Sequence, residues 1–528
     1  MTSISQSSYA CLSCRLRQSI FSQSRRAFSQ SNRLKNEARP SIAPDPVPPL
    51  KHMRQNVELY SKNCVDRRYS ELKDHPARIL ALHNKALKLH QENRPSWEKI
   101  KPLEAQLAKL SKKENLVNEE EVKELAALRG EAQAIKQNLS KVVKRTTKIS
   151  DEILDLALQL PNLTSPETPV GDEPKVLGYI NPHPDSIDPN RKFRSHVEIG
   201  TKLNLLDFSS SANTTGWGWY YLLNDAALLE QALIQYALEL ATKQGWKPVS
   251  PPSIVYTHMA DACGFNPRDH HGEQQIYKLA QKGEKKPGRS LAGTAEIPLA
   301  AMKAQKTFEA DELPLKVIGS SRCYRAEAGA RGVDTKGLYR VHEFTKVEMF
   351  AWTNPYSQPE SQDPTPTPTP PSSDPTSPTP FSSDNPTFTS LLTLQKTLLR
   401  TLGLHARVLE MPTSDLGASA YRKIDMEVYF PSRRDRQNKK DGGAWGEVSS
   451  ASMCTDYQTR RLGTRVRGMG GKGTGGSFVH TINGTAVAVP RVLAAVLEYG
   501  WVEEEGVVRV PEVLRKWMGG REVIGRGE

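Results

Sequence analysis

The sequence predicts an α+β protein, with an N-terminal antiparallel helical hairpin and a larger domain of mixed helices and strands. Residues 118–160 carry apolar side chains at alternating spacings of three and four, which is the period of a coiled-coil helix. From about residue 170 onward, amphipathic helical stretches alternate with short strand-like runs. No run of 18 apolar residues occurs in the 528-residue chain, so we expect no membrane insertion.

The first 35 residues have the composition of a mitochondrial transit peptide. No Asp or Glu precedes Glu37, and the stretch is rich in serine and in basic side chains. A membrane potential that is negative inside draws such a segment inward, so we expect the protein in the mitochondrial matrix. The alternative is a disordered basic tail. The prolines between residues 40 and 49 then predict a linker.

The helical hairpin is expected over residues 50–165, as a coiled-coil arm. Its second helix carries one apolar stripe, made of Leu125, Leu128, Ala132, Ile135, Leu139, Val142, Thr146, Ile149, Ile153, Leu156 and Leu160. The partner stripe lies upstream, within residues 79–110, and the turn is expected at 115–118. Pro95 and Pro102 disrupt helical hydrogen bonding, so we expect the upstream helix to restart with Ser96 as its cap.

The chain is basic, with 72 Lys and Arg against 59 Asp and Glu and a formal net charge of +13. This charge favours a phosphate-rich partner, nucleic acid first; the alternative is a basic organellar protein with a basic tail. The second helix of the hairpin carries the best-placed cations, which are Lys141, Lys144, Arg145 and Lys148. They predict either a contact face for an RNA backbone or the solvated exterior of a coiled coil.

Six cysteines in a chain of this length exclude a disulfide scaffold. Cys11 and Cys14 form a CxxC pair inside the segment that we expect to be removed, and no second pair follows at the spacing of a zinc site. We therefore expect no zinc and a reducing compartment.

Several motifs of the larger domain occur in a characteristic order. A helix over 224–245, with Asn224 or Asp225 as its cap, precedes an extended proline-rich segment. Residues 322–348 contain a glycine-rich loop, and residues 478–485 lead to Pro490-Arg491 and an apolar helix. These segments resemble the three signature motifs of class II aminoacyl-tRNA synthetases. The hairpin, Thr294-Ala295-Glu296 and Glu447-Val448-Ser449-Ser450 resemble features of the seryl branch of that family.

The resemblance implies a catalytic domain over residues 170–528, with an antiparallel β-sheet flanked by helices, and a homodimer built through the first motif. It also implies a reaction in two steps. The carboxylate of L-serine attacks the α-phosphorus of ATP, which gives seryl-adenylate and pyrophosphate. The 3′ end of mitochondrial tRNA(Ser) then receives the seryl group, while the helical arm contacts the tRNA.

The resemblance also assigns roles to individual residues. The catalytic set is Arg325 at the α-phosphate, Glu447 at the metal and Arg491 over the adenine; Mg²⁺ is the implied cofactor, held by Glu447 and Ser450. The implied ATP contacts are Arg325, Ala326, Glu327, Val341, Phe344, Glu447, Val448, Ser449, Ser450 and Arg491. The implied serine contacts are Thr294, Ala295, Glu296, Arg325, Glu348, Asn483 and Thr485. His342 is expected to be structural, because serine's carboxylate needs no general base.

Four positions depart from the residues that are common in this family. Thr485 stands in place of serine, Met453 in place of asparagine, Gly446 in place of arginine and Pro490 in place of glycine. Thr485 keeps a hydroxyl, so it remains a predicted serine contact. The departures concern the fine geometry of the substrate site rather than the reaction.

Residues 354–389 are rich in Pro, Ser and Thr, and we expect them to form a disordered surface insertion that buries no core. The leading functional hypothesis is a seryl-tRNA synthetase activity. The alternatives are a catalytically silent paralogue that acts as an RNA-binding or structural protein, and another class II ligase such as a threonyl or prolyl enzyme. The residues Arg325, Glu327, Glu447 and Arg491 argue against a silent paralogue.

Overall fold

The computed structural model describes residues 39–110, 119–184, 192–265, 275–280, 286–326, 337–355, 385–433, 444–467 and 476–525. The predicted transit peptide, the expected turn at 115–118 and Glu327 lie outside these ranges. The described residues form two compact units, one made mainly of residues 71–160 and one mainly of residues 161–525. No described helix combines the length and the apolar character that crossing a membrane requires.

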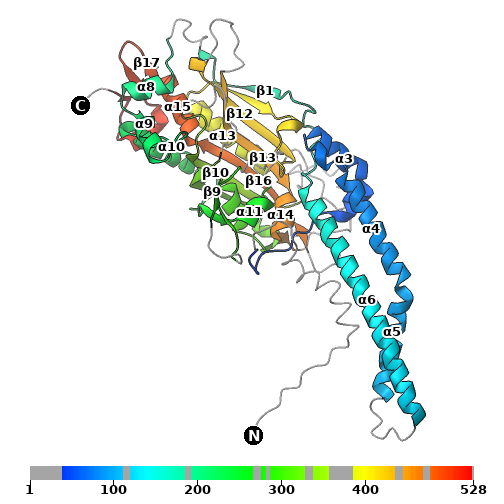
Figure 1. Cartoon of the computed structure of the whole chain (residues 1–528). Helices are drawn as coiled ribbons and strands as arrows, with labels where there is room; N and C mark the ends of the chain where they lie inside the picture. The colour runs from blue at the N-terminus through cyan, green and yellow to red at the C-terminus, as the bar shows by residue number, and fades with distance from the viewer. Residues whose placement is uncertain are drawn as a thin grey trace, which may run out of the picture. The chain divides into compact units, whose positions relative to one another are not determined.

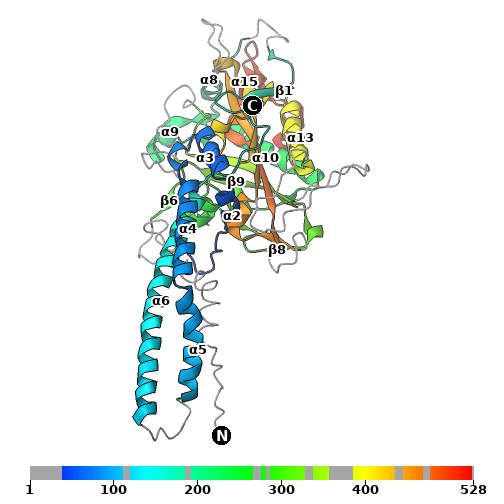
Figure 2. The same cartoon turned by 90° about the vertical axis from the view of Figure 1, so that its right-hand side faces the viewer.

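The first unit is the predicted helical hairpin. Helices α4 and α5 run alongside the long helix α6 (Figures 1 and 2). The helices of this region are α2 (Leu50–Gln55), α3 (Val57–Asp66), α4 (His75–Glu92), α5 (Arg94–Leu110) and α6 (Glu119–Gln159), with a short 3₁₀ turn at η2 (Ser70–Leu72). The apolar stripe of α6 is buried as its spacing predicts, and Ala132 and Leu139 pack against Ile100 and Leu103 of α5. The antiparallel hairpin is therefore confirmed.

The upstream helix breaks, but not at the predicted residue. Helix α4 ends at Glu92 and α5 begins at Arg94, so Ser96 lies inside α5 and does not cap it. Asn93 marks the break, and its side-chain amide donates to the carbonyl of Leu89 at 2.8 Å. Pro102 lies within α5, so the second proline is accommodated in the helix rather than ending it.

The second unit is built on an eight-stranded sheet with the order β1-β11-β12-β13-β16-β10-β9-β4 (Figure 1). All neighbours are antiparallel except β4 and β9. The strands are β1 (Lys175–Ile180), β4 (Lys247–Pro248), β9 (Leu315–Tyr324), β10 (Glu343–Thr353), β11 (Ala406–Glu410), β12 (Arg422–Tyr429), β13 (Trp445–Thr455) and β16 (His480–Ala488). The predicted antiparallel sheet flanked by helices is confirmed.

Helices and small sheets surround this central sheet. The helices are α8 (His196–Lys202), α9 (Phe208–Thr214), α10 (Asn224–Lys243), α11 (Thr257–Ala262), α12 (Glu296–Ala301), α13 (Pro386–Thr401), α14 (Tyr457–Leu462) and α15 (Val489–Gly500). The smaller strands are β2 (Leu206–Asp207), β3 (Tyr221–Leu222), β5 (Ile254–Tyr256), β6 (Lys278–Leu279), β7 (Arg289–Leu291), β8 (Thr307–Phe308), β14 (Arg465–Val466), β15 (Ser477–Phe478), β17 (Trp501–Val502), β18 (Val507–Arg509) and β19 (Val523–Ile524). Short 3₁₀ helices are η3 (Ala310–Glu312), η5 (Thr413–Asp415), η6 (Pro431–Arg433) and η7 (Glu512–Met518).

The two faces of the central sheet have different chemistry. On β10, Val347, Met349 and Ala351 belong to the large core that also holds apolar residues of α10, α13 and α15. Because side chains of a strand alternate between faces, Lys346 and Glu348 point to the opposite face. This opposite face therefore carries the polar groups of the candidate site, while the core fixes the strands that present them.

Three local expectations need correction. Helix α10 begins at Asn224 with Leu223 in the capping position, so neither Asn224 nor Asp225 caps it; the Asn224 amide instead donates to the carbonyl of Asn204 at 3.0 Å. The proline-rich segment 40–49 is not a free linker, since Val47 N–H donates to the carbonyl of Arg460 at 2.8 Å.

The third correction concerns the end of the predicted insertion. Helix α13 begins at Pro386, and the side chain of Asn385 accepts from the N–H groups of Thr387 and Phe388. Phe388 is buried in the core. Residues 385–389 therefore form the start of a helix and not a disordered loop, because an Asn cap and a proline in the first turn favour helix initiation. Residues 356–384 of the predicted insertion lie outside the described ranges.

Candidate active site

A pocket that is partly open to solvent lies on the polar face of the central sheet. Its walls come from the end of β9, from β10, β13 and β16, and from the first turn of α15. The lining residues are Arg325, Tyr339, Arg340, Val341, Phe344, Lys346, Glu447, Val448, Ser449, Ser450, Thr485, Ala488, Pro490 and Arg491. The fold thus brings together most of the residues that the sequence assigns to ATP, although these residues are spread over more than 150 positions of the chain.

One end of the pocket combines an aromatic ring with two guanidinium groups. The guanidinium carbon of Arg325 lies 5.3 Å from the centre of the Phe344 ring. Arg491 donates through Nε to the Tyr339 carbonyl at 2.9 Å and through Nη1 to the Glu447 carbonyl at 2.7 Å. A flat aromatic surface beside two cations suits a planar base that carries phosphates.

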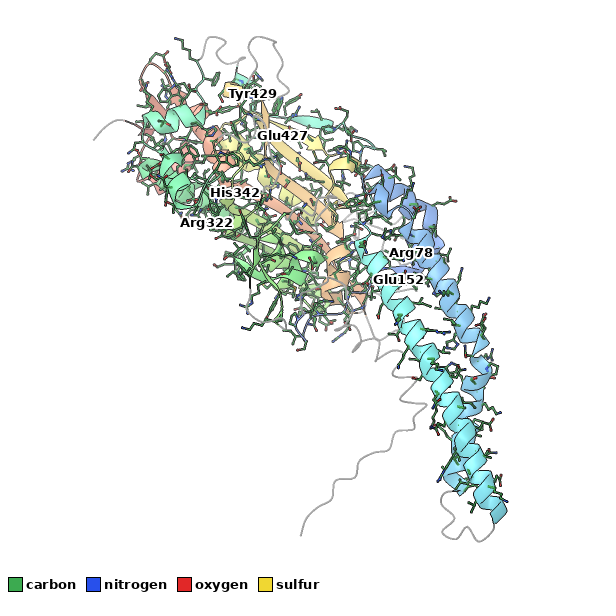
Figure 3. The ribbon with its side chains drawn as sticks, viewed as in Figure 1. Arg78, Glu152, Arg322, His342, Glu427 and Tyr429 are labelled. Atoms are coloured by element: carbon green, nitrogen blue, oxygen red, sulfur yellow. The ribbon has the colours of Figure 1, made fainter. Side chains whose placement is uncertain are left out.

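Backbone contacts fix the chain where Arg325 leaves β9. Arg325 N–H donates to the His342 carbonyl at 2.9 Å, and the next N–H, of Ala326, donates to the Gln275 carbonyl at 3.1 Å. The ring nitrogen Nδ1 of His342 lies 3.0 Å from the Arg325 carbonyl, and the ring stacks on Trp219. His342, labelled in Figure 3, is therefore engaged with the backbone that positions Arg325, as its predicted structural role requires.

Glu447 supplies an ionised carboxylate that opens onto the pocket, with 42% of its side chain exposed. Partial desolvation tends to raise its pKa, but the positive charges of Lys423, Arg491 and Arg325 outweigh this effect and hold the pKa well below its ordinary value. Ser450, on the same strand, lines the same pocket. A carboxylate and a hydroxyl are hard oxygen donors, so this pair fits Mg²⁺ together with phosphate oxygens and water.

No group of three His, Cys, Asp or Glu side chains gathers closely enough to hold a metal by itself within the part of the chain that the structure describes. A metal held at Glu447 and Ser450 would therefore need oxygen atoms from the substrate. This is the usual arrangement for Mg²⁺, which keeps waters and binds through phosphates rather than through an all-protein cage.

Two predicted ATP contacts can offer only their backbone. Val448 has its side chain in the hydrophobic core, and the buried Ser449 hydroxyl donates to the Thr485 carbonyl at 2.5 Å.

Val341 and Phe344, which line the pocket, pack together with Cys323 in a small apolar cluster. Apolar support of this kind holds the aromatic ring in place.

The residues assigned to serine form a second, more deeply buried group. Glu296, at the start of α12, accepts from the Gln458 side-chain amide at 2.6 Å and also forms a hydrogen bond with Asn483. Burial, reinforced by the neighbouring charge of Glu348, raises the pKa of Glu296 to about 7. The N–H of Glu296 donates to the hydroxyl of Thr294 at 3.3 Å. The side chain of Ala295 packs in the apolar core, so this residue can contribute only backbone atoms.

Glu348 connects the two groups. Its Oε2 lies 2.5 Å from Nζ of Lys346 and accepts from the Thr485 hydroxyl at 3.4 Å. Lys346 and Thr485 both line the pocket that holds Arg325 and Glu447. The acidic group that the resemblance assigns to serine is therefore continuous with the pocket assigned to ATP.

Sequence reasoning missed three polar residues at this site. Lys346 pairs with Glu348, and Gln458 bridges Glu296 and the Thr481 hydroxyl. Asp425 faces Ser450 across the β12–β13 ladder and pairs with Lys423 at 2.7 Å. Lys346 could have been identified from the sequence, because side chains two positions apart on a strand share a face and Glu348 was a predicted site residue. Gln458 and Asp425 could not, because their places at the site depend on contacts with other segments of the chain.

The departures from the commoner family pattern have local explanations. Met453 is fully buried in the core, so its side chain lies away from the pocket. A Cβ on Gly446 would lie 2.7 Å from the Phe430 ring. Pro490 occupies the first turn of α15, where a proline costs no helical hydrogen bond. These three positions leave the pocket's polar groups in place.

The four predicted tRNA-binding cations lie on α6 of the first unit. Lys141, Lys144, Arg145 and Lys148 are all exposed, and no ion pair connects any of them to another described residue. Other cations of the hairpin are paired between helices, such as Lys136 with Glu104 at 3.1 Å and Arg78 with Glu152 (Figure 3). The four unpaired cations are therefore available to a polyanion.

Comparison with known proteins agrees with this geometry. The model of the class II tRNA synthetase core domain (G, H, P, S and T) matches residues 277–363 and 382–499. The mitochondrial serine–tRNA ligase of Saccharomyces cerevisiae is 41% identical over 74% of this chain and 78% of its own length. The mitochondrial serine–tRNA ligase of Schizosaccharomyces pombe is 36% identical over 88% of this chain and 86% of its own length.

Among solved structures, seryl-tRNA synthetase from Pyrococcus horikoshii complexed with ATP superposes with a TM-score of 0.74 at 27% identity. The match covers 91% of this chain and 99% of that one. The similarity in fold therefore extends over nearly the whole length of the chain. The chain belongs to the serine–tRNA ligase family of class II aminoacyl-tRNA synthetases.

Proposed function

We propose that this chain is a serine–tRNA ligase that activates L-serine with ATP and Mg²⁺ and transfers it to the 3′ end of mitochondrial tRNA(Ser). The observation that carries the proposal is the continuity of the site. One pocket holds Phe344, Arg325 and Glu447 at the end suited to a nucleotide, and it reaches Thr485, whose hydroxyl bonds Glu348, at the end suited to a small amino acid.

The first step requires two anions to approach each other. A carboxylate oxygen of serine forms a bond to the α-phosphorus, and the bond from that phosphorus to the bridging oxygen breaks, so pyrophosphate leaves with the electron pair. Arg325 would stabilise the charge on the α-phosphoryl oxygens, since a guanidinium donates in a planar fork. Bound Mg²⁺ at Glu447 and Ser450 would supply further positive charge to the phosphates.

Binding of the nucleotide uses the other end of the pocket. Adenine would stack on Phe344, and Arg491 would cover its second face, because Arg491 is already fixed by hydrogen bonds to the carbonyls of Tyr339 and Glu447. In the structure the Arg325 guanidinium lies over the Phe344 ring. The nucleotide would therefore displace the Arg325 guanidinium from the ring, toward the phosphates.

Recognition of serine requires a site that rejects alanine, which lacks a single oxygen. A pocket built around hydrogen bonds to the hydroxyl does this, because its own polar groups stay unpaired when alanine binds. Glu348 would accept from the serine hydroxyl, and Glu296 would bind the ammonium group. Both carboxylates are buried, so an unpaired one is costly.

We further propose a homodimer in the mitochondrial matrix and a contact between the helical arm and tRNA. The localisation is supported by the acid-free N-terminal segment and by the similarity to mitochondrial relatives. The contact with tRNA is supported by the exposed cations Lys141, Lys144, Arg145 and Lys148. The dimer rests on the resemblance of the α10–β4 region to the first class II motif.

Amino-acid-dependent exchange of pyrophosphate into ATP tests the proposed activity. The purified chain is assayed with serine, alanine, threonine and proline in turn. We expect exchange with serine, and with the other three at least about 100-fold less. Exchange that prefers threonine or proline would favour another class II ligase, and a folded protein that exchanges with none of them would favour a silent paralogue.

A further inference from the structure

Lys346 is a buried cation at the junction of the two halves of the site. It lies on β10 midway between Phe344 and Glu348, so all three side chains emerge on the same face of the sheet. Only 8% of the Lys346 side chain is exposed. Burying an ammonium group is costly, so a cation in this position requires compensating anions.

Within the described residues, one anion contacts the ammonium directly. Nζ of Lys346 lies 2.5 Å from Oε2 of Glu348. An ammonium group has three N–H donors, so this contact leaves two donors for a ligand. Lys346 lines the same pocket as Arg325, Glu447 and Thr485, and a ligand in this pocket can reach it.

Lys346 lies close to the charged groups at both ends of the site. Lys346 lines the same pocket as Glu447, at the nucleotide end. It also opposes the rise in the pKa of Glu296, at the amino-acid end. Lys346 thus lines the pocket assigned to the nucleotide and pairs with a carboxylate assigned to serine, so it lies where the carboxylate of serine would meet the α-phosphate.

We infer that Lys346 is a further catalytic residue of this site. Its ammonium compensates the charge of Glu348. With substrates bound, its two remaining N–H groups donate to the carboxylate of serine and to an α-phosphoryl oxygen, which holds the two anions together as the oxygen–phosphorus bond forms and pyrophosphate leaves. This inference rests on the proposed serine activation.

The role differs from that of a structural counter-ion. A counter-ion would be needed only while Glu348 is charged, whereas a group that donates to the reacting anions stabilises the transition state whether or not Glu348 carries a charge. A double-variant cycle separates the two roles, because Glu348→Gln removes the charge of the partner and keeps its size.

Four proteins are compared by pyrophosphate exchange at saturating serine: wild type, Lys346→Met, Glu348→Gln and the double variant. The thermal unfolding temperature of each is measured in parallel. Lys346→Met alone should lower kcat by roughly 10²- to 10³-fold, the range for loss of one transition-state donor. The double variant should regain thermal stability relative to Lys346→Met, because no unpaired carboxylate remains, yet its kcat should stay at least about 30-fold below that of Glu348→Gln.

Lys316→Met is the matched control. Lys316 lies on the neighbouring strand β9, and its ammonium donates to the Gln244 carbonyl at 3.0 Å, outside the pocket. It should retain exchange within about twofold of wild type, since its removal deletes a lysine of the same sheet without touching the reacting groups. Lys346→Arg keeps the charge and should recover part of kcat.

A double variant with the same kcat as Glu348→Gln would overturn the inference and leave Lys346 as a counter-ion only. A kcat of Lys346→Met close to that of wild type, with serine KM alone raised, would also overturn it, because the loss would then be in ground-state binding. Absence of serine-dependent exchange in the wild type would instead contradict the proposed function itself.

Discussion

The catalytic sheet and the helical arm use the same charged residue types in opposite surroundings. On the polar face of the sheet, Glu348 and Lys346 are almost fully buried and lie 2.5 Å apart. On α6, the cations Lys144 and Lys148 are exposed and lack an ion-pair partner among the described residues. At the site on the sheet the charges are buried and paired, whereas these cations of α6 face water.

This difference indicates which part of the molecule serves serine activation and which part serves tRNA binding. Buried groups have shifted pKa values and fixed directions, as Glu296 shows, so they can align small reacting groups. Exposed lysines are mobile and well hydrated, so they contribute little to stability, but they attract a polyanion and release its counterions. We therefore expect changes on the sheet to affect activation and changes on α6 to affect tRNA binding.

The largest effect is expected on the sheet, from Arg325→Ala. The guanidinium acts mainly on charge that develops in the transition state, so adenylate formation should fall by at least about 10³-fold in a folded protein. Pyrophosphate exchange measures this loss, and circular dichroism with thermal unfolding verifies the fold. Exchange at the wild-type rate would show that Arg325 does not act at the α-phosphate.

Glu348→Ala should have a smaller and more selective effect. It removes a buried acceptor from the amino-acid pocket, so serine KM should rise by about 10- to 100-fold and discrimination against alanine should fall. The KM for ATP should change by no more than about threefold. Unchanged serine KM and unchanged discrimination would place the serine pocket elsewhere.

Neutralising Lys141, Lys144, Arg145 and Lys148 together tests the arm. Each lost phosphate contact reduces counterion release, so the slope of log affinity for tRNA against log salt should flatten by up to about 3, and affinity at low salt should fall by about tenfold or more. Serine-dependent pyrophosphate exchange without tRNA should be unchanged.

The control for the arm variant neutralises two lysines that are already paired across the hairpin. Lys99 pairs with Glu131, and Lys136 pairs with Glu104. Their replacement by Gln should change the salt slope by less than replacement of the four unpaired cations. Equal slopes for wild type and the four-residue variant would mean that the tRNA contact lies on another surface.

The buried carboxylate Glu296 predicts a pH dependence of serine binding. Its pKa is raised to about 7, so it is protonated in much of the free enzyme below pH 7 and must lose the proton to bind the ammonium group. Serine affinity should therefore rise by up to about tenfold per unit as pH increases toward 7 and level off above it. Glu348 and Lys346 also face this group, and burial keeps the nearby thiols of Cys263 and Cys454 uncharged by raising their pKa values.

Calorimetry in buffers of different ionisation enthalpy measures the coupled proton. Close to one proton should be released per serine bound at pH 6, and close to none at pH 8.5. Glu296→Gln keeps the acceptor for Gln458 and should abolish this proton release. Proton release that persists in the variant would assign the titration to another group.

The smallest effect is expected from deleting residues 356–384 and joining the ends through a short Gly/Ser linker. Composition predicts that this segment buries no core, so aminoacylation should stay within about twofold of wild type. Extending the deletion to residue 389 should be more harmful, because it removes the Asn385 cap and the buried Phe388. Equal effects of the two deletions would contradict the placement of the α13 start.

Much of this architecture is accessible from sequence because it depends on local period. The stripe from Leu125 to Leu160 predicts α6, whereas the strands around Arg325 and Glu348 are implied by the resemblance to the second class II motif. Helix starts were harder: Asn385 caps α13 inside a Pro-, Ser- and Thr-rich stretch whose composition masks it. At the start of α10, the side-chain amide of Asn224 instead donates a hydrogen bond to the carbonyl of Asn204. The sequence around Asn224 does not predict this contact.

The site is less predictable where it depends on pairing between strands. Family resemblance supplies Arg325 and Glu447, but the ion pair between Lys346 and Glu348 follows from the alternation of β10 and from its burial. Gln458 reaches Glu296 from 162 residues away. Such contacts are set by tertiary packing, and a single sequence carries no signal for them.

The most direct test of the central claim measures both half-reactions on the same three proteins: wild type, Arg325→Ala and the four-cation arm variant. The division of function between sheet and arm predicts that Arg325→Ala loses pyrophosphate exchange and aminoacylation together. It predicts that the arm variant keeps serine-dependent exchange at the wild-type rate while charging of tRNA(Ser) falls by about tenfold or more at limiting tRNA. Loss of exchange in a folded arm variant, or normal exchange in Arg325→Ala, would contradict it.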